Sequence, residues 1–233
     1  MKKLIIPAGE KELLAVYSHV DPFDKGVSAL RKEGLELITA RDLAYVRLLG
    51  GAKSPMSREW TWVAENFNYF PNGDILIASK KYSPLLRKGS PEEATECRRQ
   101  GKEFYLDKKI AKELCERAEV DPTLAIKSGV LLLHRKAVKS EIPSTALKDA
   151  PLMYFLFKDT AKQYGQFLKE NNIDSVPTYF VDADYAKKQK QPFGRALWVN
   201  NHILRSILDG DNDYLHLNNG GRVRGVRRYM ALN

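Results

Sequence analysis

The pattern of hydrophobic and polar positions is clearest over residues 152–184, where it predicts a strand, a helix and a second strand. Residues 152–157 (LMYFLF) form an unbroken apolar run of strand length, which is typical of a strand covered on both faces. Apolar side chains then recur at helical spacing over residues 161–168. Residues 177–181 (PTYFV) are rich in β-forming side chains. The pattern therefore predicts a βαβ unit over residues 152–182.

Other segments support the same fold class. Residues 74–79, 130–134 and 196–199 are short apolar runs and predict further strands. Thr39 and Asp107 precede helical patterns, and their side-chain oxygens are suited to accept hydrogen bonds from the first free amides of a helix. Strands alternating with helices predict an α/β (or α+β) protein with a mixed, largely parallel sheet.

A further helix is predicted to begin at Ser57. Trp60, Val63, Ala64 and Phe67 recur at helical spacing, so that one face of this helix would point into the core.

The end of the chain predicts a C-terminal β-hairpin. Residues 214–217 and 222–226 are β-rich segments on either side of Asn218-Asn219-Gly220-Gly221. Asparagine and glycine tolerate the positive φ angles that tight hairpin turns require.

The domain count is open at this stage. A chain of 233 residues is long enough for one domain over residues 1–233 or for two smaller ones. The alternative division is an N-terminal α/β region, residues 1–135, and a C-terminal region, residues 150–233. The polar segment between them contains Pro143 and Ser144 and is the best candidate for a linker.

Composition indicates a folded protein in the cytoplasm. The sequence is 43% hydrophobic and 29% charged, which is unlike a disordered chain. We find no apolar run long enough to span a bilayer and no segment with the apolar length of a signal peptide, so we expect no membrane partner. Cys97 and Cys115 stand far apart with no Cys/His cluster around them, and reduced, buried thiols are predicted.

Charge points to an anionic partner. Lys and Arg exceed Asp and Glu by 38 to 29, a net charge of +9. Residues 185–233 hold nine of the basic residues and three of the acidic ones, so six of the nine excess charges lie in the last fifth of the chain. A field of this sign favours polyanions.

The arginines of the predicted hairpin are the first candidate site. In a regular strand Arg222, Arg224 and Arg228 share one face with Val226, and Arg227 lies on the other. Guanidinium groups at strand spacing can pair with successive phosphate oxygens. The alternative is a solvated edge strand, whose charges prevent aggregation. Three lysines before the hairpin would extend the basic patch, namely Lys187, Lys188 and Lys190.

Asp182 and Asp184 are the second candidate site. They follow a predicted buried strand, and open α/β sheets bind ligands at the carboxyl ends of their strands. Two carboxylates at this spacing are suited to Mg²⁺ or Mn²⁺. The alternative is a helix N-cap followed by a loop aspartate.

Other motifs are weaker. Asp209, Asp211 and Asp213 match the first ligands of a calcium loop, but the later glycine and glutamate are missing. Residues 50–54 (GGAKS) look like the end of a phosphate loop, although a helix C-cap is the better interpretation. His134 ends an apolar strand and could face a cleft.

Three functional hypotheses follow. The first is a protein that binds DNA or RNA, or another phosphate-bearing anion, through its basic C-terminal hairpin, with possible metal-dependent processing of the nucleic acid. The second is a metal-dependent transferase or phosphohydrolase that acts on a nucleotide-like small molecule. The third is an interaction protein without chemistry. Whether the protein is an enzyme is left open, and no catalytic residue is assigned.

Overall fold

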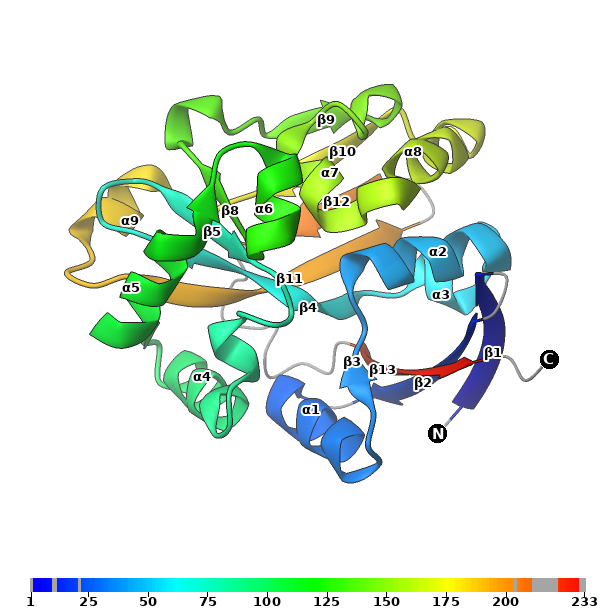
Figure 1. Cartoon of the computed structure of the whole chain (residues 1–233), viewed down its shortest axis with the longest axis horizontal. Helices are drawn as coiled ribbons and strands as arrows, with labels where there is room; N and C mark the ends of the chain where they lie inside the picture. Colours follow the sequence, from blue (N-terminus) through cyan, green and yellow to red (C-terminus); the bar gives the residue numbers. More distant parts are fainter. Residues whose placement is uncertain (1, 10–11, 21, 203–204, 211–221, 231–233) are drawn as a thin grey trace.

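One curled sheet runs through the molecule, with helices against both of its faces (Figure 1). The computed structural model describes residues 2–9, 12–20, 22–202, 205–210 and 222–230. The main path through the sheet runs in the order β1 (Lys2–Gly9), β2 (Glu12–Val20), β13 (Arg222–Met230), β4 (Thr61–Tyr69), β11 (Phe193–His202), β12 (Arg205–Asp209), β10 (Ser175–Tyr179) and β9 (Glu141–Pro143).

The combination of helices with a mixed sheet confirms the α/β class. Most strand pairs are antiparallel, so the expectation of a largely parallel sheet is wrong. The parallel pairs among the described strands are β10 with β12, β13 with β4, and β7 with β8. A strand from the end of the sequence is inserted between two strands from its first third, because β13 lies between β2 and β4. The branches off the main path are β3 (Glu36–Leu37), β5 (Ile75–Ala78), β6 (Phe104–Tyr105), β7 (Ala118–Glu119) and β8 (Val130–Leu133).

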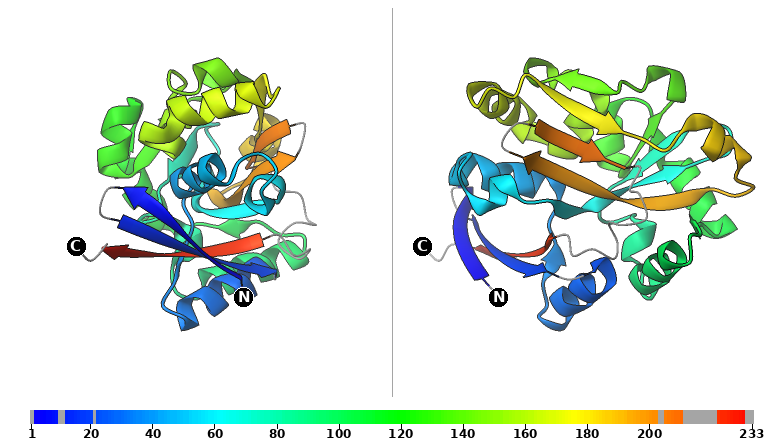
Figure 2. Two further views of the ribbon diagram at one scale, coloured as in Figure 1. Left: turned by 90° about the vertical axis from the view of Figure 1, so that its right-hand side faces the viewer. Right: turned by 180° about the vertical axis from the view of Figure 1, so that it is seen from behind.

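The helices divide between the two faces of the sheet (Figures 1 and 2). One face carries α2 (Ala40–Gly50), α3 (Pro55–Arg58), α6 (Pro122–Ser128), α7 (Pro151–Phe157) and α8 (Ala161–Glu170). The other carries α1 (Phe23–Lys32), α4 (Ser90–Arg99) and α5 (Lys108–Arg117), while α9 (Ala183–Lys188) follows β10 at one end of the molecule. Short 3₁₀ turns are η1 (Pro84–Leu86), η2 (Arg135–Ala137), η3 (Ser144–Ala146) and η4 (Lys158–Thr160). Within the described residues, no helix is both long and apolar enough to cross a membrane.

Strand β4 separates two hydrophobic clusters. Its side chains alternate between them, with Val63 and Phe67 in the cluster under α2, α7 and α8, and Trp62 and Ala64 in the cluster under α1, α4 and α5. Every residue of β4 is buried. A central strand covered on both faces has no side exposed to water, and this explains why β4 shows no alternation of buried and exposed positions.

The segment 151–157 is a helix, so the predicted βαβ unit over residues 152–182 is wrong. Pro151 occupies the first helical turn, where its missing amide hydrogen costs nothing. Leu152, Met153, Phe155, Leu156 and Phe157 are all buried in the cluster around α2 and α8. A short apolar run surrounded by core has no polar face, and its pattern cannot distinguish a strand from a buried helix.

The helix predicted to begin at Ser57 is wrong for the same reason. Pro55–Arg58 forms only one turn, and the chain then enters strand β4. Trp60, Val63, Ala64 and Phe67 satisfy a helical spacing only because every position in this segment is apolar or buried.

The predicted C-terminal hairpin is described only in its second half. Residues 211–221, which hold its turn and first strand, lie outside the described residues. Strand β13 pairs with β2 along its whole length. It also packs closely on α1, since a Cβ atom at Gly225 would lie 2.3 Å from Leu30, and one at Gly26 would lie 2.3 Å from Val223.

Glu65 of β4 is a buried acid whose side chain contacts the first residue of α2. It lies on β4 with 4% of its surface exposed, and its carboxylate accepts a hydrogen bond of 2.9 Å from the Ala40 amide. Burial raises its pKa to about 7, while that hydrogen bond and the charge of Lys158 partly offset the rise. The folded protein therefore holds a proton on Glu65 that the unfolded chain releases near pH 4.5.

Glu65→Gln is expected to make the unfolding free energy less dependent on pH. Below about pH 4.5 the acid is protonated in both states, and the native protein loses stability as the pH rises toward 7. The loss expected from this shift is about 3 kcal/mol by pH 8. Urea unfolding at pH 5 and pH 8 measures the difference, with exposed Glu92→Gln as the control. The same pH dependence in Glu65→Gln and in the native protein would contradict the assignment.

Candidate functional site

The first predicted site, on β13, is an internal ion cluster. Arg224 is 1% exposed, and its guanidinium donates to the Thr61 hydroxyl at 2.6 Å and to the Glu59 carboxylate. Arg222 on the same face pairs with the same carboxylate at 3.2 Å. Burial, followed by the charge of Arg47, lowers the pKa of Arg224 to about 10, so the group is still protonated at neutral pH. The alternation of the strand is as expected, but this face points into the protein.

The other residues of the predicted basic patch come from two separate elements. Arg227 and Arg228 continue β13 opposite Ala15 and Leu14 of β2. Lys187 and Lys188 lie in α9, and exposed Lys190 follows it. Figure 1 shows α9 at one end of the molecule, whereas β13 runs from near the middle toward the other end. Closeness in the sequence therefore does not produce one basic surface.

Asp182 is a helix N-cap. Its carboxylate accepts hydrogen bonds of 2.9 Å from the amides of Asp184 and Tyr185, and these bonds hold its pKa below the usual range. Asp184 is exposed and lies 3.3 Å from the Lys187 ammonium. In the described part of the chain, no three His, Cys, Asp or Glu side chains gather as metal ligands. The metal-binding interpretation is therefore not retained.

The weaker motifs resolve in different ways. Gly51 has a φ of 71° and ends α2, which confirms the C-cap interpretation of residues 50–54. Asp211 and Asp213 lie outside the described residues. The cysteines are free, but Cys115 is exposed, so the expectation that both are buried is wrong.

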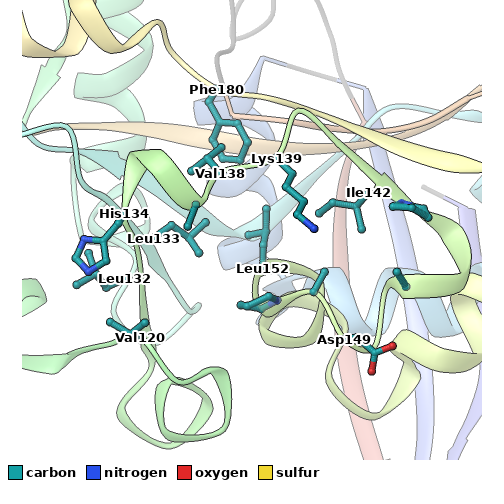
Figure 3. Close-up of a pocket in the computed structure, with 15 residues that line it drawn as sticks. Val120, Leu132, Leu133, His134, Val138, Lys139, Ile142, Asp149, Leu152 and Phe180 are labelled. Atoms are coloured by element: carbon teal, nitrogen blue, oxygen red, sulfur yellow. The ribbon is translucent and has the colours of Figure 1, made fainter.

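An apolar pocket of about 250 Å³ lies beside β8 and β9 (Figure 3). Polar side chains contribute little of its wall, and the nearest are His134, Lys139 and Asp149. The lining is formed by Val120, Leu132, Leu133, His134, Ala137, Val138, Lys139, Ile142, Pro143, Ala146, Asp149, Ala150, Pro151, Leu152 and Phe180.

The pocket wall is fixed by contacts to the core. Ile142 and Leu152 are buried and belong to the hydrophobic cluster under α2, α7 and α8. Phe180 stacks on Phe67 of β4, with ring centroids 5.4 Å apart and planes within 9°. His134 Nδ1 lies 2.9 Å from the Asp74 carboxylate, which orients the ring at the end of β8. A pocket built in this way is largely formed before any ligand arrives.

Few features of the sequence predict this pocket. Residues 135–149 are the segment interpreted as a possible linker, because Arg135, Lys136, Lys139 and Lys148 make it polar. The signal that could have found the pocket is the set of small apolar residues between these charges, Ala137, Val138, Ile142, Pro143 and Ala146. The hypothesis that His134 faces a cleft is confirmed, because its side chain is part of the lining.

Comparisons with known proteins identify the fold. No protein-family model matches the sequence, and a search of curated proteins finds no relative. One solved structure is similar, described as "Accommodation of massive sequence variation in Nanoarchaeota by the C-type lectin fold". The identity is 14%, the TM-score is 0.64, and the match covers 96% of this chain and 100% of that one. This likeness shows that the chain has the C-type lectin fold.

The nucleic-acid-binding hypothesis is therefore wrong. The C-type lectin fold is not known for binding nucleic acid or for metal-dependent catalysis, and the metal-dependent enzyme hypothesis gains no support either. The geometry explains the error, because Arg224 is buried and Arg222 shares the same internal carboxylate. Some of the positive charges that suggested a polyanionic partner are therefore paired with a carboxylate of the protein itself.

Arg224→Met is expected to destabilise the protein by about 2–3 kcal/mol, because it leaves the Thr61 hydroxyl and part of the Glu59 carboxylate without a donor. Arg222→Met removes the same charge from the same strand, but the Arg222 side chain is 34% exposed. Its expected cost is less than about 1 kcal/mol. Urea unfolding of both variants measures the contrast. Equal losses would show that Arg224 has no special internal role.

Proposed function

We propose that this protein is a ligand-binding protein that uses its apolar pocket to take up the apolar part of a small organic molecule. The observation that supports the proposal is the cavity of about 250 Å³, lined mainly by aliphatic side chains and by Phe180. Ligand pockets are usually concave, mostly apolar and largely pre-formed, with a few polar groups that orient the ligand.

The position of the pocket favours binding without large rearrangement. One wall comes from the end of β8 and from η2, and another from β9, η3 and the start of α7. These short segments pack against the hydrophobic core, to which Ile142 and Leu152 belong. Ordering a flexible wall on binding would reduce the affinity, and a wall that is packed in advance avoids that loss.

The fold comparison agrees with a division between a constant core and a variable surface. The similar solved structure is described as accommodating massive sequence variation by the C-type lectin fold. A fold that tolerates variation needs a stable interior. For this chain we propose that the buried clusters supply that interior and that the pocket wall supplies recognition.

Saturable binding of a neutral apolar dye tests the proposal. N-phenyl-1-naphthylamine fluoresces strongly in apolar surroundings and carries no charge, so its binding reports the cavity alone. We expect one dye molecule per protein. Ala137→Trp places an indole in the pocket wall and is expected to weaken binding at least about tenfold, a loss of about 1.4 kcal/mol.

A matched variant and a second blocking variant make the test specific. Ala52→Trp adds the same side chain in the loop after α2, which does not line the pocket, and is expected to leave dye binding unchanged. Ala146→Trp blocks the pocket from η3 instead of η2. Circular dichroism checks that each variant is folded. No saturable binding to the native protein, or undiminished binding in both blocked variants, would refute the proposed function.

A further inference from the structure

Lys139 is a solvent-exposed cation at the edge of the apolar pocket. Figure 3 shows its side chain extending toward Ile142 and Leu152, which line the same pocket. Among the described residues, this ammonium has no hydrogen-bond or ion-pair partner. Ile142 and Leu152 are 5% and 4% exposed, whereas Lys139 is exposed, so the charge stands at the open edge of the pocket beside its buried apolar wall.

The backbone fixes where Lys139 stands. The Thr178 hydroxyl donates a hydrogen bond to the Lys139 carbonyl, and the Thr178 amide donates to the Ser140 carbonyl at 2.8 Å. Thr178 belongs to β10 and is buried. The Lys139 backbone is therefore tied to the sheet, and its side chain starts from a defined point on the pocket wall.

The acidic residue of the pocket does not neutralise this lysine. Asp149 lies at another part of the lining (Figure 3), and its carboxylate is 3.9 Å from the Lys148 ammonium. His134, at the opposite end of the pocket, shares its Nδ1 with Asp74. Lys139 is thus the cation of the lining that is available to a ligand.

We propose that the pocket binds an amphipathic monoanion, an organic acid whose apolar chain fills the cavity and whose carboxylate pairs with Lys139. This inference rests on the proposed function and adds the ligand class. A carboxylate at this edge of the pocket is attracted by the ammonium, a neutral head group gains no such attraction, and a cationic head group is repelled. A ligand with several negative charges fits less well, because Asp149 would oppose a second anionic group.

A matched series of ligands tests the inference. Octanoate, octanol and octylamine share one alkyl chain and differ only in the head group. We expect octanoate to bind the native protein about tenfold more tightly than octanol, and octylamine to bind most weakly. Isothermal titration calorimetry measures the affinities, and displacement of the neutral dye confirms that the ligands occupy the same pocket.

Variants of Lys139 locate the preference. Lys139→Gln is expected to reduce octanoate affinity about tenfold, to the level of octanol, and to leave octanol affinity unchanged. Lys139→Arg is expected to keep the preference for the acid. Lys136→Gln removes an exposed charge from η2 that does not line the pocket, and it is expected to change neither affinity.

The outcomes separate this inference from the proposed function. If the dye binds but octanoate and octanol bind equally, or if the acid preference survives in Lys139→Gln, the assigned ligand class is wrong and the proposed function stands. If neither dye nor acid binds the native protein, both are overturned. An acid preference that disappears in Lys139→Gln and persists in Lys136→Gln supports the pairing with Lys139.

Discussion

Buried guanidinium groups impose the main constraint on this fold, because a charge removed from water needs a complete set of partners. Arg47 of α2 is fully buried, and its acceptors are neutral oxygens from other elements. They are the carbonyls of Met56 and Val199 and the hydroxyl of Tyr164, each at 3.0 Å, and the carbonyl of Glu59 at 3.4 Å. The helix α2 can therefore take only one position relative to α8 and β11.

Two further arginines extend this constraint across the sheet. Arg224 connects β13 to Glu59 and Thr61 at the start of β4. Arg195 of β11 binds Glu103 at 2.6 Å, and the same carboxylate accepts a hydrogen bond of 2.7 Å from Tyr185 of α9. The first and last parts of the chain belong to one sheet, and Arg224 and Arg195 hold neighbouring elements together through hydrogen bonds to Glu59 and Glu103. Among the described residues, these three arginines therefore contribute their charge to the interior instead of to the surface.

The pocket depends on the same framework without being part of it. Phe180 reaches the cavity from the end of β10 and rests on Phe67 of the central strand. Lys139 is oriented through Thr178 of β10, which pairs with β12 in the sheet. The residues that line the pocket come mostly from short turns and strand ends. Substitutions at these positions would not disturb the buried arginines. Ile142 and Leu152 belong to both the core and the pocket wall, whereas exposed lining residues such as Lys139 do not contribute to the core.

The sequence by itself determined those features that local chemistry decides. Thr39 and Asp107 cap their helices through side-chain oxygens, Gly51 ends α2 at a positive φ, and the strands at residues 75–78 and 130–133 follow from isolated apolar runs. These signals act within a few residues, so they can be read without the rest of the chain.

Tertiary structure decided the rest, because burial on all sides removes the polar face that periodicity needs. Residues 152–157 became a helix and residues 61–69 a strand, although each apolar pattern permitted both. The alternation in β13 was visible, but pairing with β2 and β4 determined that Arg224 points inward. The pocket brings together Val120, Lys139 and Phe180 from distant parts of the chain. No local sequence pattern predicts that these residues lie close together, since their proximity depends on the order of the strands in the sheet.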